Sequence, residues 1–183
     1  MFAYTRRGIV RYIASPWRRR WDEIIIHHTF RPTVKDFERR PNGVYWMKAM
    51  DRVHRLKGWN GIGYHFVIMP DGLIYVGRDL DTGGAHTVGH NMTGIGVCIL
   101  GNFDEEDVPP DAYVSLKYLV SFLIIRFEEN MWMKEKAVYF HRQFARKSCP
   151  GWRLKLDEVR AAIARTLPDA RERYQALLEG EKQ

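Results

Sequence analysis

The chain has 183 residues and a mass of 21.6 kDa, a size typical of one domain with a hydrophobic core. Apolar residues make up 45% and aromatic residues 13% of the chain, which is too much for a disordered protein. The two cysteines exclude a small secreted fold that depends on several disulfide bonds. No apolar run approaches the ~20 residues of a membrane span. Arg6, Arg7 and Arg11 interrupt any signal-peptide core, so we expect folding in the cytoplasm.

The net charge of +7 is unevenly distributed. Residues 1–20 contain six arginines and no acid, whereas the rest of the chain holds 23 basic and 22 acidic residues and carries a net +1. We therefore divide the chain into a basic aromatic arm (1–20), a nearly neutral body (21–167) and a polar tail (168–183). The arm either packs on the body or contacts an anionic membrane or lipopolysaccharide. Its apolar residues are Phe2, Tyr4, Ile9, Val10, Tyr12, Ile13 and Trp17.

The first part of the body shows one strand and one helix. Residues 23–28 form an unbroken β-branched run that predicts a short buried strand. Residues 31–42 are polar, contain two prolines and are expected to form a loop. From 44 to 57, apolar residues recur every three or four positions and predict a helix that stops at Gly58.

A hairpin signal follows. Residues 64–69 and 73–76 are apolar and flank Pro70-Asp71-Gly72, a turn sequence. Residues 77–93 are rich in glycine and histidine and are expected to form a loop. A loop of this length in a compact domain is usually functional. Another buried strand is expected at 95–100.

The last third alternates helices with one strand. A proline opens a predicted helix at 110–130, residues 137–141 resemble a strand, and residues 156–167 form a core helix before a polar helical tail. Strands and helices mixed in this order predict a single α/β domain, in which a central mixed sheet is flanked by helices.

Histidine and cysteine residues lie where strands end. His27 follows the first strand, His141 ends the last one, and Cys149 comes eight residues later. Imidazole nitrogen and thiolate are preferred zinc ligands, and three protein ligands with one open position are typical of a catalytic site. The alternatives at this point are a hydrogen-bonded core histidine and a cysteine that acts as a small hydrophobic residue.

Five blocks in the same order resemble one family. They are IIIHHT at 24–29, GWNGIGYHFVI at 58–68, GAH at 84–86, GIGVCILGNF at 94–103 and HRQFARKSCPG at 141–151. Together they resemble the zinc-dependent type 2 N-acetylmuramoyl-L-alanine amidases, a family that includes phage endolysins and peptidoglycan recognition proteins. The phage lysozyme-type amidases match best, and the resemblance covers roughly residues 22–165.

The resemblance implies a mixed sheet with one shallow zinc cleft. It assigns one Zn²⁺ to His27, His141 and Cys149, and the catalytic roles to Tyr64 and Lys147. Strand alternation sends His28 to the opposite face from His27. His65, next to Tyr64, is expected to be structural, and Cys98 to belong to the core.

Five further residues are substrate-binding candidates: His86, Trp59, Asn91, Thr93 and Asn102. For Trp59 a place in the core is an alternative. For the two asparagines and Thr93 a role in a turn is equally consistent with the sequence.

The function implied is that of a zinc-dependent peptidoglycan hydrolase, an endolysin that cleaves the amide between N-acetylmuramic acid and L-alanine. We expect a monomer stored in the host cytoplasm until it reaches the cell wall or periplasm at lysis. Two alternative functions are consistent with the same site residues. One is a non-catalytic peptidoglycan-binding module, and the other is a thiol amidase in which His141 activates Cys149. Nucleic acid is not expected as a partner, because the body carries a net charge of only +1.

Overall fold

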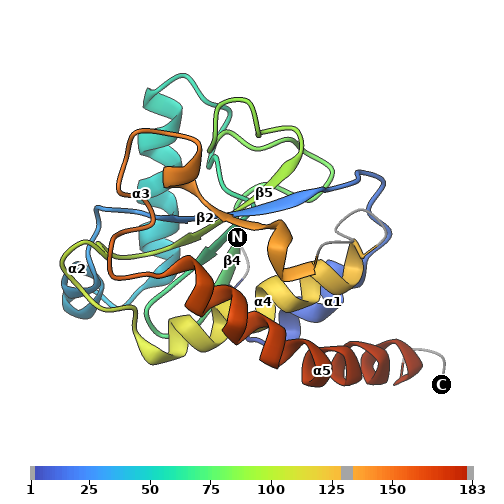
Figure 1. The fold of residues 1–183 in the computed structure, drawn as a ribbon. Helices are drawn as coiled ribbons and strands as arrows, with labels where there is room; N and C mark the ends of the chain where they lie inside the picture. Colours follow the sequence, from blue (N-terminus) through green and yellow to red (C-terminus); the bar gives the residue numbers. More distant parts are fainter. Residues whose placement is uncertain (1–2, 129–133, 181–183) are drawn as a thin grey trace.

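Six strands form one mixed sheet in the order β1-β4-β3-β5-β2-β6 (Figure 1). The computed structural model describes residues 3–128 and 134–180. The strands are β1 (Ala3–Tyr4), β2 (Glu23–His28), β3 (Phe66–Ile68), β4 (Ile74–Val76), β5 (Gly94–Ile99) and β6 (Val138–Phe140). The helices are α1 (Gly8–Ala14), α2 (Val34–Arg39), α3 (Gly43–Leu56), α4 (Pro110–Arg126) and α5 (Leu156–Gly180), with 3-10 turns at Lys134–Ala137 and His141–Gln143.

The centre of the sheet is parallel and one edge is antiparallel. β2 lies between β5 and β6 and runs parallel to both, and β3 runs parallel to β5. β4 pairs antiparallel with β3, as the predicted hairpin requires, and β1 pairs antiparallel with β4. The predicted fold class, a mixed sheet flanked by helices, is confirmed.

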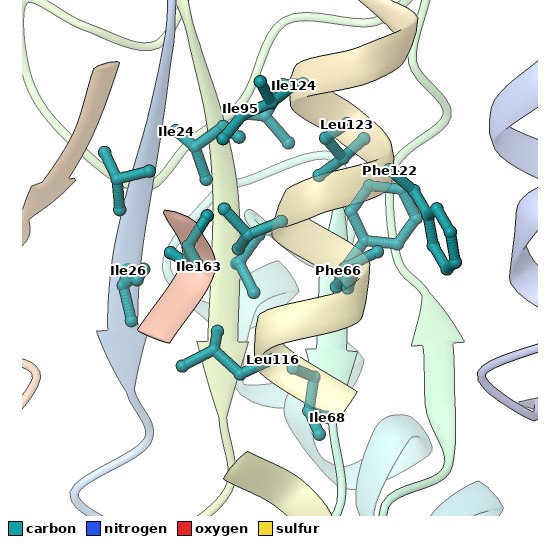
Figure 2. Packing of buried hydrophobic residues seen from close by; sticks show 14 of the residues in the cluster. Ile24, Ile26, Phe66, Ile68, Ile95, Leu116, Phe122, Leu123, Ile124 and Ile163 are labelled. Atoms are coloured by element: carbon teal, nitrogen blue, oxygen red, sulfur yellow. The ribbon is translucent and has the colours of Figure 1, made fainter. Parts of the chain in front are cut away.

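A large core fills one face of the sheet. In Figure 2, side chains of α4 and α5 meet isoleucines and a phenylalanine from β2, β3 and β5. Because the strands alternate, the other face carries a separate, smaller core that packs against α3 and α2. Val67 and Cys98 are among its fully buried strand residues, and Met47 of α3 covers them. Functional side chains that point to this second face therefore lie away from α4 and α5.

The predicted loop at 31–42 was wrong, because it contains helix α2. The Thr33 hydroxyl accepts a hydrogen bond from the Asp36 backbone, and the Asp36 carboxylate accepts one from the Thr33 backbone. This reciprocal capping stabilises a helix start even in a short polar segment. The helix expected at 44–57 is confirmed as α3, which Asn42 caps.

The basic N-terminal segment packs on the body. Ile9, Val10 and Ile13 are at most 3% exposed and belong to the same core as the sheet. Tyr12 and Trp17 pack against that core and are partly buried. Phe2, which we grouped with them, lies outside the described residues. The apolar side of this segment is therefore covered by protein.

The C-terminal segment forms one helix where the sequence suggests a core helix and a separate tail. α5 runs through Pro168 without ending. Ala170 and Tyr174, beyond the proline, are buried in the large core, and Arg171 pairs with Glu128 at 3.0 Å. These contacts offset the hydrogen bond that proline cannot make. Helix α4 begins at Pro110 as predicted but ends at Arg126, so its predicted end at Asn130 was wrong. Within the described part of the chain, none of the helices combines the length and apolar character needed to cross a bilayer.

Candidate metal centre

The register of two parallel strands brings His27 and His141 together. Ile26 of β2 is paired with Phe140 of β6, so the next residues of the two strands are His27 and His141. Their rings lie with centroids 4.5 Å apart. The residue after His27 points the other way, since Nδ1 of His28 accepts a hydrogen bond from the backbone of Phe103 in the large-core face. The alternation predicted for this histidine pair is confirmed.

A short loop returns Cys149 to the same place. The backbone N–H of Arg142 donates to the carbonyl of Cys149 at 2.8 Å, which closes the loop that follows His141. The Arg142 guanidinium also donates to the carbonyls of Gly151 and Leu154. From the other side, Ser148 donates to the Asp104 carboxylate at 2.6 Å. The position of Cys149 is therefore fixed by hydrogen bonds on both sides of it.

The three donor atoms fit a zinc ion. Among the residues that the structure describes, His27, His141 and Cys149 form a group whose ligand atoms all lie within 4.8 Å of one another, and all three residues are buried. Cys149 Sγ is 3.7 Å from His27 Nδ1. A tetrahedral zinc with normal Zn–N and Zn–S bonds would separate these two atoms by about 3.6 Å. Two imidazoles and one thiolate are also the donor types that zinc prefers.

Burial sets the protonation of the three groups. The pKa of His27 is held well below its ordinary value, first by burial and then by neighbouring His86, so its ring stays neutral and can ligate. Burial also lowers the pKa of His141. Burial raises the pKa of the Cys149 thiol to about 11. A thiol with this pKa is a poor nucleophile, which disfavours the thiol-amidase alternative, whereas a bound cation would compensate its thiolate.

A chain of hydrogen bonds orients His27 from behind. His86 is buried, and its Nε2 lies 3.1 Å from the carbonyl of Gly94, so Nε2 carries the proton and Nδ1 is an acceptor. His86 Nδ1 lies 3.1 Å from His27 Nε2, which therefore donates to it. This leaves the lone pair of His27 on Nδ1, the atom that faces Cys149. The hydroxyl of Thr87 lies 3.3 Å from the same Nε2. His86 thus contacts a ligand residue from inside the protein.

We expect His86→Ala to weaken zinc binding by about 10–100-fold, because partners that orient a metal-ligating histidine have effects of this size. The measurement is a zinc competition titration with a chromophoric chelator. His90→Ala is the matched control, since His90 lies on the same loop but bonds Glu23 instead. Equal zinc affinity for the His86 variant and the unmodified protein would contradict this orienting role.

Tyr64 lies beside the metal-ligand group. Its ring packs 5.1 Å from that of His27 and 5.7 Å from that of His54. Burial, with a smaller contribution from neighbouring Cys98, holds the pKa of the phenol well above its ordinary value. Tyr64 therefore stays protonated and can donate a hydrogen bond. The sequence analysis missed His54, whose Nδ1 accepts a hydrogen bond from the Gly63 backbone. The signal in the sequence was its spacing, four residues after Met50 and therefore on the same face of α3.

Two hollows flank the ligand group. One, of about 430 Å³, lies between Tyr64, the loop after β2 and the outer side of α3, including Trp46, Val53 and His54. The other, of about 870 Å³, is formed by the loop between His141 and Cys149. Lys147 is exposed in this second hollow and Trp152 at its edge is 60% exposed. Tyr64 and Lys147 therefore lie in different hollows.

Other substrate-binding candidates are held by the protein itself. The side-chain oxygen of Asn91 accepts from the backbones of His86 and Thr87, and that of Asn102 accepts from Asp104. The Thr93 hydroxyl donates to Glu23. These bonds favour the turn roles that we gave as alternatives.

Trp59 and His65 occupy different surroundings. Trp59 is 36% exposed, and its ring lies 4.7 Å from that of His54. It thus borders the Tyr64 side of the site. His65 is fully buried, where Nδ1 accepts from Gly96 and Nε2 faces the Thr82 carbonyl, so its expected structural role is confirmed.

Comparisons with known proteins agree with this geometry. The family model described as N-acetylmuramoyl-L-alanine amidase matches residues 17–152. Peptidoglycan-recognition protein LB of Drosophila melanogaster is 34% identical over 132 residues, which cover 72% of this chain and 55% of that protein. The endolysin of Escherichia phage T7 is 31% identical over 121 residues, 63% of this chain and 76% of its own length. An N-acetylmuramoyl-L-alanine amidase endolysin of Clostridium intestinale, of known structure, superimposes with a TM-score of 0.64 at 30% identity, covering 84% of this chain and 86% of that chain. The match spans only 22% of a human N-acetylmuramoyl-L-alanine amidase and about half of the recognition protein.

Proposed function

We propose, on the premise that this chain belongs to the N-acetylmuramoyl-L-alanine amidase family, that it hydrolyses the amide between N-acetylmuramic acid and L-alanine in peptidoglycan. The observation that carries the proposal is the buried group of His27, His141 and Cys149, which adjoins Tyr64 of one hollow and the 142–148 loop of the other. A recognition module needs only the hollows. Hydrolysis additionally requires the three converging ligand atoms.

The metal and the side chains of the protein would contribute different parts of the catalysis. When bound by the three ligands, zinc supplies Lewis acidity and a coordinated water whose pKa falls toward ~7. The chain itself must bind the substrate carbonyl and stabilise the negative charge that develops on its oxygen. The protonated Tyr64 phenol is a hydrogen-bond donor next to His27. Lys147, two residues before Cys149, supplies a positive charge from the opposite side.

The hollow along α3 is suited to the stem peptide. Its walls combine apolar surface from Trp46, Met50 and Val53 with two positive charges and one negative charge, those of Arg31, Lys57 and Asp36. A peptide with carboxylate groups and short apolar side chains matches such a surface. One relative of known structure, the Tyr-to-Phe variant of Drosophila recognition protein LB, was solved in complex with tracheal cytotoxin. We infer that this chain binds a peptidoglycan fragment in the hollow along α3.

A non-catalytic peptidoglycan-binding role is the second candidate. The similarity to recognition proteins favours it, because binding alone would use the same hollows. The presence of Cys149, Tyr64 and Lys147 together supports catalysis instead. The similarity to phage endolysins supports a role in wall lysis, for which we propose storage of a monomer in the host cytoplasm until lysis.

Mass spectrometry of digested wall tests the reaction. We expect purified peptidoglycan treated with the protein to release stem peptides that begin at L-alanine, with the glycan chains left intact. A strong chelator should stop the release, and added zinc should restore it, because the ligands are neutral histidines and a thiolate. Cleaved glycan chains would contradict the proposed bond. Binding of wall without any released peptide, with zinc bound to the protein, would favour the recognition module.

A further inference from the structure

The N-terminal segment, residues 3–20, runs along helix α4 and carries a row of arginines. Arg6 pairs with Asp111 near the start of α4 at 3.5 Å, and the Arg126 side chain at its end donates to the Ser15 carbonyl at 3.3 Å. The segment therefore follows the whole helix, which is about 25 Å long. In Figure 1, α1 lies beside α4. We name the exposed arginines of this segment the arginine row: Arg6, Arg7, Arg11, Arg18 and Arg20.

The row faces solvent because the opposite side of α1 is buried. Ile9, Val10 and Ile13 point into the large core, and Arg7 and Arg11, one helical turn apart, share the outer side. Within the described parts of the chain, Arg7, Arg11 and Arg20 form no ion pair with an acid. Arg18 and Arg19 lie beside the Asp81 carboxylate, which accepts hydrogen bonds from both of their backbones, and Arg6 pairs with Asp111. Residues 1–20 contain no acid, so acids from elsewhere in the chain offset only part of their six positive charges.

An apolar cavity opens beneath the row. It has a volume of about 710 Å³ and lies between α1, α4 and α5. Val10, Val114, Phe122 and Leu177 contribute apolar lining, while Arg6, Arg7 and Arg173 stand among its walls. Cations next to an apolar hollow match a partner that joins an anionic group to a hydrocarbon chain.

We propose that this face binds an anionic phospholipid bilayer, with headgroup phosphates on the arginine row and an acyl chain in the cavity. Charge complementarity argues for this occupant, and the cavity argues against a purely hydrophilic polyanion. Because the apolar side of α1 is already buried in the protein, the contact is peripheral and the segment does not insert as an amphipathic anchor. The metal-ligand group lies on the other side of the sheet, so a bound membrane leaves the cleft free.

Vesicle sedimentation with the full chain tests the proposal. The protein should bind vesicles made of equal parts phosphatidylglycerol and phosphatidylcholine but not vesicles of phosphatidylcholine alone. The triple variant Arg7→Gln, Arg11→Gln, Arg20→Gln should bind the anionic vesicles roughly 100-fold more weakly, since each basic residue near such a surface contributes about fivefold. A charge-matched control, Lys35→Gln, Lys48→Gln, Arg52→Gln, removes three exposed cations from α2 and α3 and should bind like the unmodified protein.

A second variant tests the cavity. Ala176→Trp places a bulky side chain at an exposed position in its wall and should weaken binding severalfold while leaving the arginines in place. Circular dichroism must show that all variants are folded. Equal loss in the control triple would overturn the proposal in favour of nonspecific attraction. Retention on duplex DNA that depends on the arginine row, with no binding to anionic vesicles, would overturn it in favour of nucleic acid.

Discussion

A Cys149→Ser variant is expected to fold, to lose its zinc and to lose peptidoglycan hydrolysis by more than about 1,000-fold. Serine keeps the size of the side chain but replaces a thiolate ligand with a hydroxyl, a much poorer zinc donor. Substituting a residue that only hydrogen-bonds to a metal ligand already lowers metal affinity or activity by about 10–100-fold. Substituting the ligand itself should therefore cost more. Zinc content by atomic spectroscopy and release of stem peptides measure the two effects.

Cys98→Ser is the matched control for this prediction. Cys98 is fully buried and lies on β5 beside His27, but it is not one of the three grouped ligand residues. Its serine variant should therefore keep one zinc per chain. A Cys149→Ser protein that hydrolyses wall normally would contradict the zinc assignment. One that keeps its zinc but loses activity would instead support Cys149 as a nucleophile.

Tyr64→Phe should lower kcat by about 100–1,000-fold and leave zinc binding unchanged. The ring contacts with His27 and His54 are kept, and only the hydroxyl is removed. Removing one donor aimed at a developing oxyanion commonly raises the barrier by about 3 kcal/mol. Turnover of a soluble muropeptide, read together with zinc content, checks this result. A rise in KM with an unchanged kcat would show that Tyr64 only binds the substrate.

Lys147→Ala offers a comparison on the other side of the site. Lys147 is exposed, so solvent and salt screen its charge, and we expect a loss on the order of tenfold that shrinks as ionic strength rises. Its zinc content should not change. If the Tyr64 and Lys147 variants lost activity equally, and neither loss depended on salt, screening of the Lys147 charge would not explain its effect.

The local patterns of the sequence determined the main elements. Period-two alternation correctly separated His27 from His28. Three- and four-residue spacing located α3, and the opening proline located α4. The sequence analysis missed the capping residues of α2, Thr33 and Asp36, because it judged this segment by its polar residues and prolines alone. Such signals depend on neighbours within one or two turns, so the sequence alone contains them.

What only the tertiary structure decided depends on strand order and packing between distant residues. The position of His86 behind His27, 59 residues away, follows from the pairing of β5 with β2. The burial of α1 and the course of α5 through Pro168 follow from contacts with α4, which no local pattern records. The sequence by itself thus determined which residues are candidates for the chemistry of this chain. The tertiary structure decided which of them touch, because contact between distant segments is set by the packing of the whole sheet.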